Sequence, residues 1–154
     1  MIDKNLPFID KPKIKSLLPH RDPMLLIDNL YNILPMKSAL GQLKLTNDKF
    51  FLQGHFPGQP VMPGVMIVEA FGQAAAALAA YSIDKKEVEN KLVYLMSVQN
   101  ARFRKPVMPP CNLYLECIVD KIKGKIWRYK GIAYCNNQKM ADAEWMATIV
   151  DRND

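Results

Sequence analysis

The sequence predicts an α+β fold in which a curled antiparallel sheet of about six strands wraps around one long buried helix. The first reason is the segment from Phe50 to Ile83, where Glu69 is the only Asp, Glu, Lys or Arg. The second is a series of four strand-like stretches that follows this segment. The chain has 154 residues, of which 49% are hydrophobic, so we expect a single domain over residues 1–154.

Before the apolar segment we expect a short amphipathic piece and two strands. The piece is Lys13–Leu18, and it ends at the turn-forming cluster Pro19–Pro23. Met24–Ile27 is a short apolar run and is expected to form the first strand. Apolar and polar side chains alternate over Ala39–Leu45, which predicts a second strand with one face in water.

The apolar segment divides into a loop and a helix. Gly54–Gly64 is rich in glycine and proline and is predicted to be an irregular loop. Proline is tolerated at the first position of a helix, so Pro63 marks a helix start, and Val65–Tyr81 continues without a polar face. Such a helix must be covered on all sides, and we expect the whole segment to be buried.

Four further strands are expected after a polar break at Asp84–Asn90. Short turns join them, among them Lys123–Lys125 and Asn136–Asn137. Strands joined this way pair antiparallel and complete the sheet. The four are Leu92–Val98, Leu113–Val119, Ile126–Tyr134 and Met140–Val150.

The charge balance favours an acidic or polyanionic partner. The chain has 21 Lys+Arg against 15 Asp+Glu, a formal net charge of +6 and a pI of about 9.2. One basic cluster has no recognition-helix or stacking-aromatic motif beside it, so we interpret it as a solvated strand face and expect no nucleic-acid binding. The cluster is Lys121, Lys123, Lys125, Arg128 and Lys130.

Other features favour a cytoplasmic protein. The three cysteines, Cys111, Cys117 and Cys135, are an odd number without C-x-x-C spacing, which argues against a disulfide framework and fits a reducing compartment. The first residues lack the apolar core of a signal peptide. Val65–Ile83 is long enough for a membrane span, but Glu69 would cost about 2.5–3.5 kcal/mol at a bilayer centre, so we expect no span.

Two titratable residues of the uncharged segment are candidates for chemistry. His55 could act as a general base, although an isolated histidine is more often structural. Glu69 has no basic neighbour in the sequence. Either a distant partner such as Arg102 or Arg104 neutralises its carboxyl group, or burial raises the pKa so that the group stays protonated and serves as a general acid.

The helix start supplies a third component. The N–H groups of Gly64 and Val65 have no acceptor inside the helix and are expected to face an oxyanion. Gln73 lies one turn beyond Glu69 and is expected to orient its carboxyl group. A base, an acid and amide donors suit the removal of a proton beside a carbonyl group. Spacing leaves open whether His55 and Glu69 meet within one chain or across two.

Competing chemistries have little support in the sequence. Neither histidine has a second ligand at metal-binding spacing, and no phosphate-cradling or dinucleotide motif occurs, so we expect no metal and no cofactor. No serine lies in a G-x-S-x-G context. Cys111 lies beside two prolines with nothing nearby to lower its pKa, so it is a poor candidate for a nucleophile.

Three stretches closely resemble the bacterial (3R)-hydroxyacyl-[acyl-carrier-protein] dehydratases, which have the hot-dog fold. They are Leu17–Asp28, His55–Ala70 with its H-F-P-G and P-G-V-M segments, and Ala101–Val107. They span essentially the whole chain in order. The resemblance implies a hydro-lyase of fatty acid biosynthesis that converts a (3R)-hydroxyacyl thioester into a trans-2-enoyl thioester, with an apolar tunnel beside the helix for the acyl chain.

The resemblance also implies roles and partners. His55 would be the base, Glu69 the acid and the Gly64 amide the oxyanion contact, without a cofactor. Relatives that also isomerise the double bond have aspartate where this chain has Glu69, so a dehydratase-only type is expected. Homodimers with shared active sites, assembled into hexamers, are implied. Acyl carrier protein is acidic, so its candidate docking residues are Arg102, Arg104 and Lys105.

Some points stay open at this stage. A thioesterase would bind the same substrate but let water attack the carbonyl group. His20 belongs to the first motif, and a loop-anchoring role is expected for it. The chain departs from the family at Pro109–Cys111, where a glycine and an aspartate are usual after the first proline, so this turn must differ locally.

Overall fold

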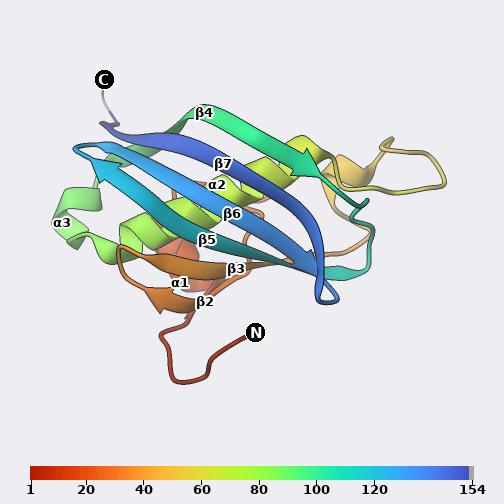
Figure 1. Ribbon diagram of the computed structural model, residues 1–154, viewed down its shortest axis with the longest axis horizontal. Coiled ribbons are helices and arrows are strands. Elements are labelled where there is room, and N and C mark those ends of the chain that lie inside the picture. The colour runs from red at the N-terminus through yellow and green to blue at the C-terminus, as the bar shows by residue number, and fades with distance from the viewer. Residues whose placement is uncertain (153–154) are drawn as a thin grey trace.

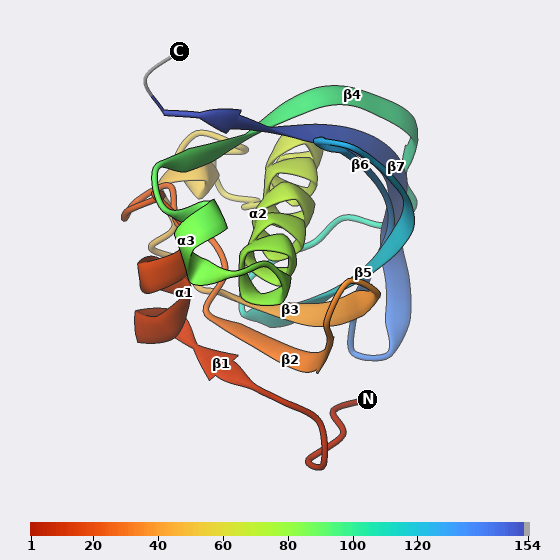
Figure 2. The same cartoon turned by 90° about the vertical axis from the view of Figure 1, so that its left-hand side faces the viewer.

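A seven-stranded antiparallel sheet curls around a central helix in the computed structural model, which describes residues 1–152. The strand order is β1-β2-β3-β5-β6-β7-β4, and the sheet wraps around α2 as seen along the helix (Figures 1 and 2). The strands are β1 (Ile9–Asp10), β2 (Asn29–Leu34), β3 (Ser38–Leu45), β4 (Lys91–Phe103), β5 (Cys111–Lys123), β6 (Ile126–Cys135) and β7 (Gln138–Asp151). The helices are α1 (Lys11–Leu17), the 3₁₀ turn η1 (Phe50–Leu52), α2 (Gly64–Ser82) and α3 (Lys85–Val88).

The expected α+β architecture is confirmed, and the main error concerns the first strand. Met24–Ile27 is not a strand, although Leu25, Leu26 and Ile27 are buried. Their backbone groups bond to partners outside the sheet. The Leu25 N–H donates to Arg21 O, and the Leu26 N–H donates to the side chain of Gln73. The strand begins later, at β2, and the short β1 pairs with it. The sheet therefore has seven strands instead of about six.

Helix α2 packs closely against the inner face of the sheet. A Cβ atom at Gly41 of β3 would lie 2.9 Å from Ala74 Cβ, so small residues set this spacing. At Gly131 of β6 a Cβ atom would lie 2.7 Å from the rings of Phe71 and Trp145, which stack with centroids 5.2 Å apart. The helix is apolar enough to span a membrane by length and composition, but 56% of its most apolar window is buried, and it is the core helix of this domain.

The apolar segment is less buried than expected. In the N-terminal half of α2, Val65 is 74% exposed, and Val68, Glu69 and Gly72 are partly exposed. These four residues follow the spacing i, i+3, i+4, i+7 and so form one stripe on the helix. The preceding loop is also open, with Phe56 56% exposed. A single chain therefore leaves one face of its central helix uncovered.

Strand β4 forms one edge of the sheet and is unusually apolar for an exposed edge. Its only neighbour in the part of the chain that the structure describes is β7, to which it pairs antiparallel. Tyr94, Leu95, Met96 and Val98 are 39–53% exposed. An edge strand of this kind is a ready template for pairing with another chain, and proteins ordinarily protect it.

The expectation for the cysteines was wrong. Cys111 at the start of β5 and Cys135 at the end of β6 are paired as a disulfide, with Cα atoms 6.6 Å apart. The two lie 24 residues apart in sequence, and only the β5–β6 pairing brings them together. Cys117 is free and buried, and burial raises the pKa of its thiol. The cysteine count therefore no longer bears on the cellular compartment.

Candidate functional site

His55 is held in a short loop between η1 and α2. Its backbone carbonyl accepts from the Val61 N–H at 2.8 Å, and its ring Nδ1 lies 2.7 Å from the Val61 carbonyl oxygen. Inside this closed segment, Phe56 and Gln59 exchange two backbone hydrogen bonds. Gly58 has a φ of +75°, which glycine adopts without strain. The loop therefore fixes both the backbone and the ring of His55.

The contact with Val61 also fixes the tautomer of His55. A carbonyl oxygen only accepts hydrogen bonds, so the proton of the neutral ring lies on Nδ1. Nε2 then carries a free lone pair, as a general base requires. The sequence identified His55 as a base candidate, and this orientation is what the structure adds.

Glu69 is fixed by Gln73, as the spacing predicted. Gln73 is 1% exposed, and its Oε1 accepts from the Leu26 N–H at 2.8 Å. Its Nε2 donates both to Met24 O at 2.7 Å and to Glu69 Oε1 at 2.8 Å. The two backbone contacts thus show which end of the Gln73 amide is the oxygen and which is the nitrogen. Because the nitrogen donates to Glu69 Oε1, that carboxyl oxygen must be the acceptor. The carboxyl proton of an acid at this position is therefore carried by Oε2.

The carboxyl group of Glu69 differs from the sequence expectation in two respects. Its side chain is 34% exposed, because it lies on the uncovered stripe of α2. Its partners are Gln73 and His20 instead of Arg102 or Arg104. His20 Nε2 lies 3.6 Å from Glu69 Oε1, a contact that sequence spacing gave no reason to expect.

The start of α2 presents free amide donors. Pro63 is the N-cap, and its carbonyl oxygen accepts from Met66 and Ile67. Within residues 1–152, the N–H groups of Gly64 and Val65 have no acceptor, as expected for the first turn of a helix. They point out of the N-terminus of a 19-residue helix, where negative charge is stabilised.

Gly64→Ala is expected to lower kcat/KM for the expected dehydration by about tenfold to a hundredfold, less than the loss of about 10²–10³ that follows removal of an oxyanion donor, because the N–H group itself remains. A Cβ atom tilts toward the helix N-terminus, so the methyl group would stand beside the free donors. It would also lie 2.9 Å from the ring of Phe103, which is 51% exposed and can move aside. Steady-state kinetics in wild-type and Phe103→Ala backgrounds separate the two effects, because relief of the ring contact alone should not restore activity. Full recovery in the double variant would contradict the oxyanion role.

The structure does not join all the predicted site residues within one chain. In the described part of the chain, His55 is not an ion-pair or hydrogen-bond partner of Glu69. His55 is tied to Val61, whereas Glu69 lies further along α2 on its uncovered stripe. A single chain therefore holds His55 in the loop that leads into the start of α2 and, separately, Glu69 with Gln73 and His20 beside it.

The predicted basic residues lie next to the start of α2. The ring of Phe103 approaches Gly64, and the Met62 N–H donates to Val107 O, so the end of β4 lies beside the helix N-terminus. Arg104 pairs with Asp142 at 2.6 Å and, with Lys139, holds the pKa of that carboxyl group below its usual value. Lys105 donates to Gln138, and Arg102 has no ion-pair partner within residues 1–152. Arg102 and Lys105 are thus the more available cations.

Other candidate sites are less well supported. The described residues contain no group of three His, Cys, Asp or Glu that could hold a metal ion. The basic cluster on β5 and β6 alternates with acidic partners, since Arg128 and Lys130 both pair with Asp120. A cavity of about 900 Å³ lies between the N-terminal segment and the outer face of the sheet, and neither His55 nor Glu69 lines it.

Fold and site together define a hot-dog-fold protein of the dehydratase type. The FabA-like domain family matches residues 18–144, and the chain belongs to this family. It is 47% identical over 146 residues to the 3-hydroxyacyl-[acyl-carrier-protein] dehydratase FabZ of Anaeromyxobacter sp. (strain K), which covers 95% of this chain and 94% of the relative. The enzyme of the same name from Myxococcus xanthus (strain DK1622) is 45% identical over 145 residues, 94% of each chain.

Solved structures with low sequence identity share the fold. The dehydratase heterocomplex ApeI:P from Xenorhabdus doucetiae superposes with a TM-score of 0.79 at 16% identity, over 91% of this chain and 92% of that chain. Cj0977 from Campylobacter jejuni, a sigma28-regulated virulence protein, gives a TM-score of 0.66 at 15% identity, over 90% of this chain and 96% of that chain. At these identities the likeness establishes the architecture alone.

Proposed function

We propose that this protein removes water from (3R)-hydroxyacyl-[acyl-carrier-protein] to give trans-2-enoyl-[acyl-carrier-protein] in fatty acid biosynthesis. The observation that carries the chemistry is the hydrogen bond from His55 Nδ1 to Val61 O, because it leaves Nε2 free as a base. The membership of the dehydratase family supports the substrate class. We further propose that residues 1–154 form one domain and that the enzyme acts in the cytoplasm.

In this mechanism His55 Nε2 takes a proton from C2 of the substrate. Negative charge then develops on the thioester oxygen, where the N–H groups of Gly64 and Val65 stabilise it. Glu69 gives the proton on its Oε2 to the hydroxyl group at C3, and the C3–O bond breaks to release water. The electron pair left on C2 forms the double bond, so the elimination balances without a cofactor.

We assign the two halves of each site to different chains of a homodimer. The uncovered stripe of α2 carries Glu69, and a second chain over this face would complete the burial of the helix. The exposed apolar edge of β4 offers a matching surface for antiparallel pairing with its own copy. The partner would then supply His55. We propose that such dimers associate further into hexamers.

The acyl chain is proposed to extend along α2 beyond Glu69. A small cavity of about 30 Å³ lies there, lined by His20 and mostly by apolar side chains, among them Ala76, Ala79, Ile83 and Val88. This volume holds about one water-sized group, so the second chain or side-chain movement must open the tunnel. At the other end, Arg102 and Lys105 beside the helix N-terminus are the proposed contacts for the acidic carrier protein. Arg104 would contribute once released from Asp142.

A spectroscopic assay tests the proposed function. Purified protein added to a crotonyl thioester should decrease the absorbance of the enoyl group as it is hydrated, and the His55→Ala variant should not. Released thiol, trapped with a chromogenic reagent in the same reaction, would reveal a thioesterase instead. Wild-type rates no higher than those of His55→Ala would refute the dehydratase.

A further inference from the structure

His20 contacts the acid of the proposed reaction from outside helix α2. It lies in the loop between α1 and β2, and its Nε2 is 3.6 Å from Glu69 Oε1. Gln73 donates to the same oxygen from one helical turn away. Both groups therefore face Oε1, and neither is recorded at Oε2. We propose that His20 is a positioning residue that directs the proton of Glu69 to Oε2, an inference that rests on the proposed dehydratase function.

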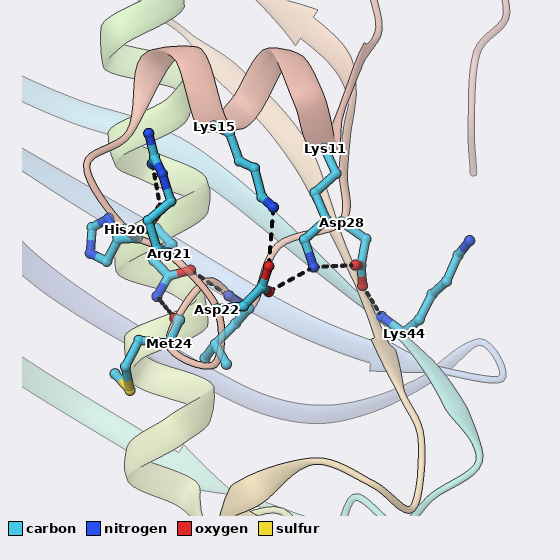
Figure 3. Close-up of polar contacts among 10 residues, drawn as sticks. Lys11, Lys15, His20, Arg21, Asp22, Met24, Asp28 and Lys44 are labelled. Atoms are coloured by element: carbon cyan, nitrogen blue, oxygen red, sulfur yellow. Dashed lines mark hydrogen bonds and ion pairs between the residues drawn. The ribbon is translucent and has the colours of Figure 1, made fainter.

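The loop is held firmly enough to place His20 accurately. Arg21 Nη1 donates to the carbonyl oxygens of Leu18 and His20, at 2.9 and 2.7 Å. Asp22 pairs with Lys15 and Lys11, which hold the pKa of its carboxyl group below the ordinary value. Figure 3 shows Lys11, Lys15 and Asp22 on one side of the loop and His20 on the other, next to α2.

The surroundings of His20 indicate which nitrogen carries its proton. Nδ1 is buried and has no hydrogen-bond partner within residues 1–152. A proton on Nδ1 would thus be a buried donor without an acceptor, which is costly, whereas Nε2 faces a carboxyl oxygen. In the neutral ring, the proton of His20 therefore lies on Nε2. His55 has the opposite tautomer, with its proton on Nδ1.

The contacts of His20 and Gln73 with Glu69 Oε1 take effect while Glu69 transfers its proton. As Glu69 gives up the proton on Oε2, negative charge spreads over both carboxyl oxygens. The N–H groups of His20 and Gln73 stabilise that charge through Oε1. Because the charge is absent before the transfer, the contact with His20 should raise kcat more than it affects substrate binding.

The test compares three substitutions of His20. His20→Ala should lower kcat by about tenfold and leave KM within about twofold. Glutamine places an amide nitrogen near the position of Nε2, whereas asparagine places it near Nδ1. His20→Gln should therefore recover most of the lost kcat, and His20→Asn should behave like His20→Ala. Equal rates for the glutamine and asparagine variants would refute the proposal. An increase in KM that grows with acyl length would also refute the proposal, because this result would mean that His20 only lines the cavity.

A second measurement does not depend on activity. The chain has two histidines, so nitrogen NMR of ¹⁵N-histidine protein resolves both rings. The proposal requires protonated Nε2 at His20 and protonated Nδ1 at His55, and Glu69→Ala should shift the Nε2 signal of His20. A proton on Nδ1 of His20, or no response to Glu69→Ala, would refute the positioning role even in active enzyme. An inactive wild type with the required tautomers would refute the proposed function alone.

Discussion

Replacing Glu69 with glutamine is expected to lower kcat for crotonyl-thioester hydration by about a thousandfold while the protein stays folded. Glutamine has nearly the same shape as glutamate. Its Oε1 can still accept from Gln73, which is the contact seen at 2.8 Å. The group at the position of Oε2 becomes an amide, which cannot give a proton to the leaving hydroxyl group. The result should be a folded and correctly assembled enzyme without its acid.

Steady-state kinetics, circular dichroism and size-exclusion chromatography together check this expectation. Glu89→Gln is a suitable control, because it makes the same substitution at an exposed glutamate at the end of α3, far from Glu69 in sequence. The control should keep wild-type activity and assembly. If Glu69→Gln also kept activity near the wild-type level, Glu69 would have a structural role only.

Leu95→Lys is expected to separate the proposed dimer into monomers at micromolar protein concentration and to lower specific activity by at least about a hundredfold. Leu95 is 51% exposed on the apolar edge of β4. Lysine on an edge strand opposes pairing with another chain, because its charge loses water when the edges join. Separated chains would each keep a base and an acid but would no longer bring them together.

Analytical ultracentrifugation and activity across a concentration series measure both effects. Activity per chain should rise as protein concentration rises, because mass action restores the dimer. The control is Ile122→Lys, which places the same charge at a 36% exposed isoleucine near the β5–β6 turn. Full activity in a monomeric Leu95→Lys protein would contradict a site shared between chains.

The sequence predicted most of the fold because its signals were local. Helix α2 and strands β3 to β7 were placed within a few residues of their ends, apart from the longer β4 and β5, because periodicity and turn residues mark them directly. The failure at Met24–Ile27 has a non-local cause. The apolar run was read correctly as buried, but its backbone bonds with Arg21 and the side chain of Gln73. No pattern within the run reveals a partner 47 residues away.

In the candidate site, too, some features follow from the local sequence and others depend on distant contacts. The positions of Gln73 and Gly64 follow from helical geometry, so sequence spacing was enough for both. The contact of His20 with Glu69 depends on how a distant loop folds against α2, and the Cys111–Cys135 pair depends on strand register. The exposure of one face of α2 could not be predicted from the sequence either. A uniformly apolar helix gives no sign of whether the residues that cover it belong to the same chain.

The position of β4 in the sheet has a consequence for synthesis of the chain. Its only neighbour within residues 1–152 is β7, which begins at Gln138 and ends at Asp151, so β4 has no strand beside it until β5, β6 and β7 have been synthesised. During that interval both edges of an apolar strand are open, a state prone to aggregation. Strand β7 is thus the one that shields the nascent β4, and weaker pairing between β4 and β7 should lower solubility during synthesis.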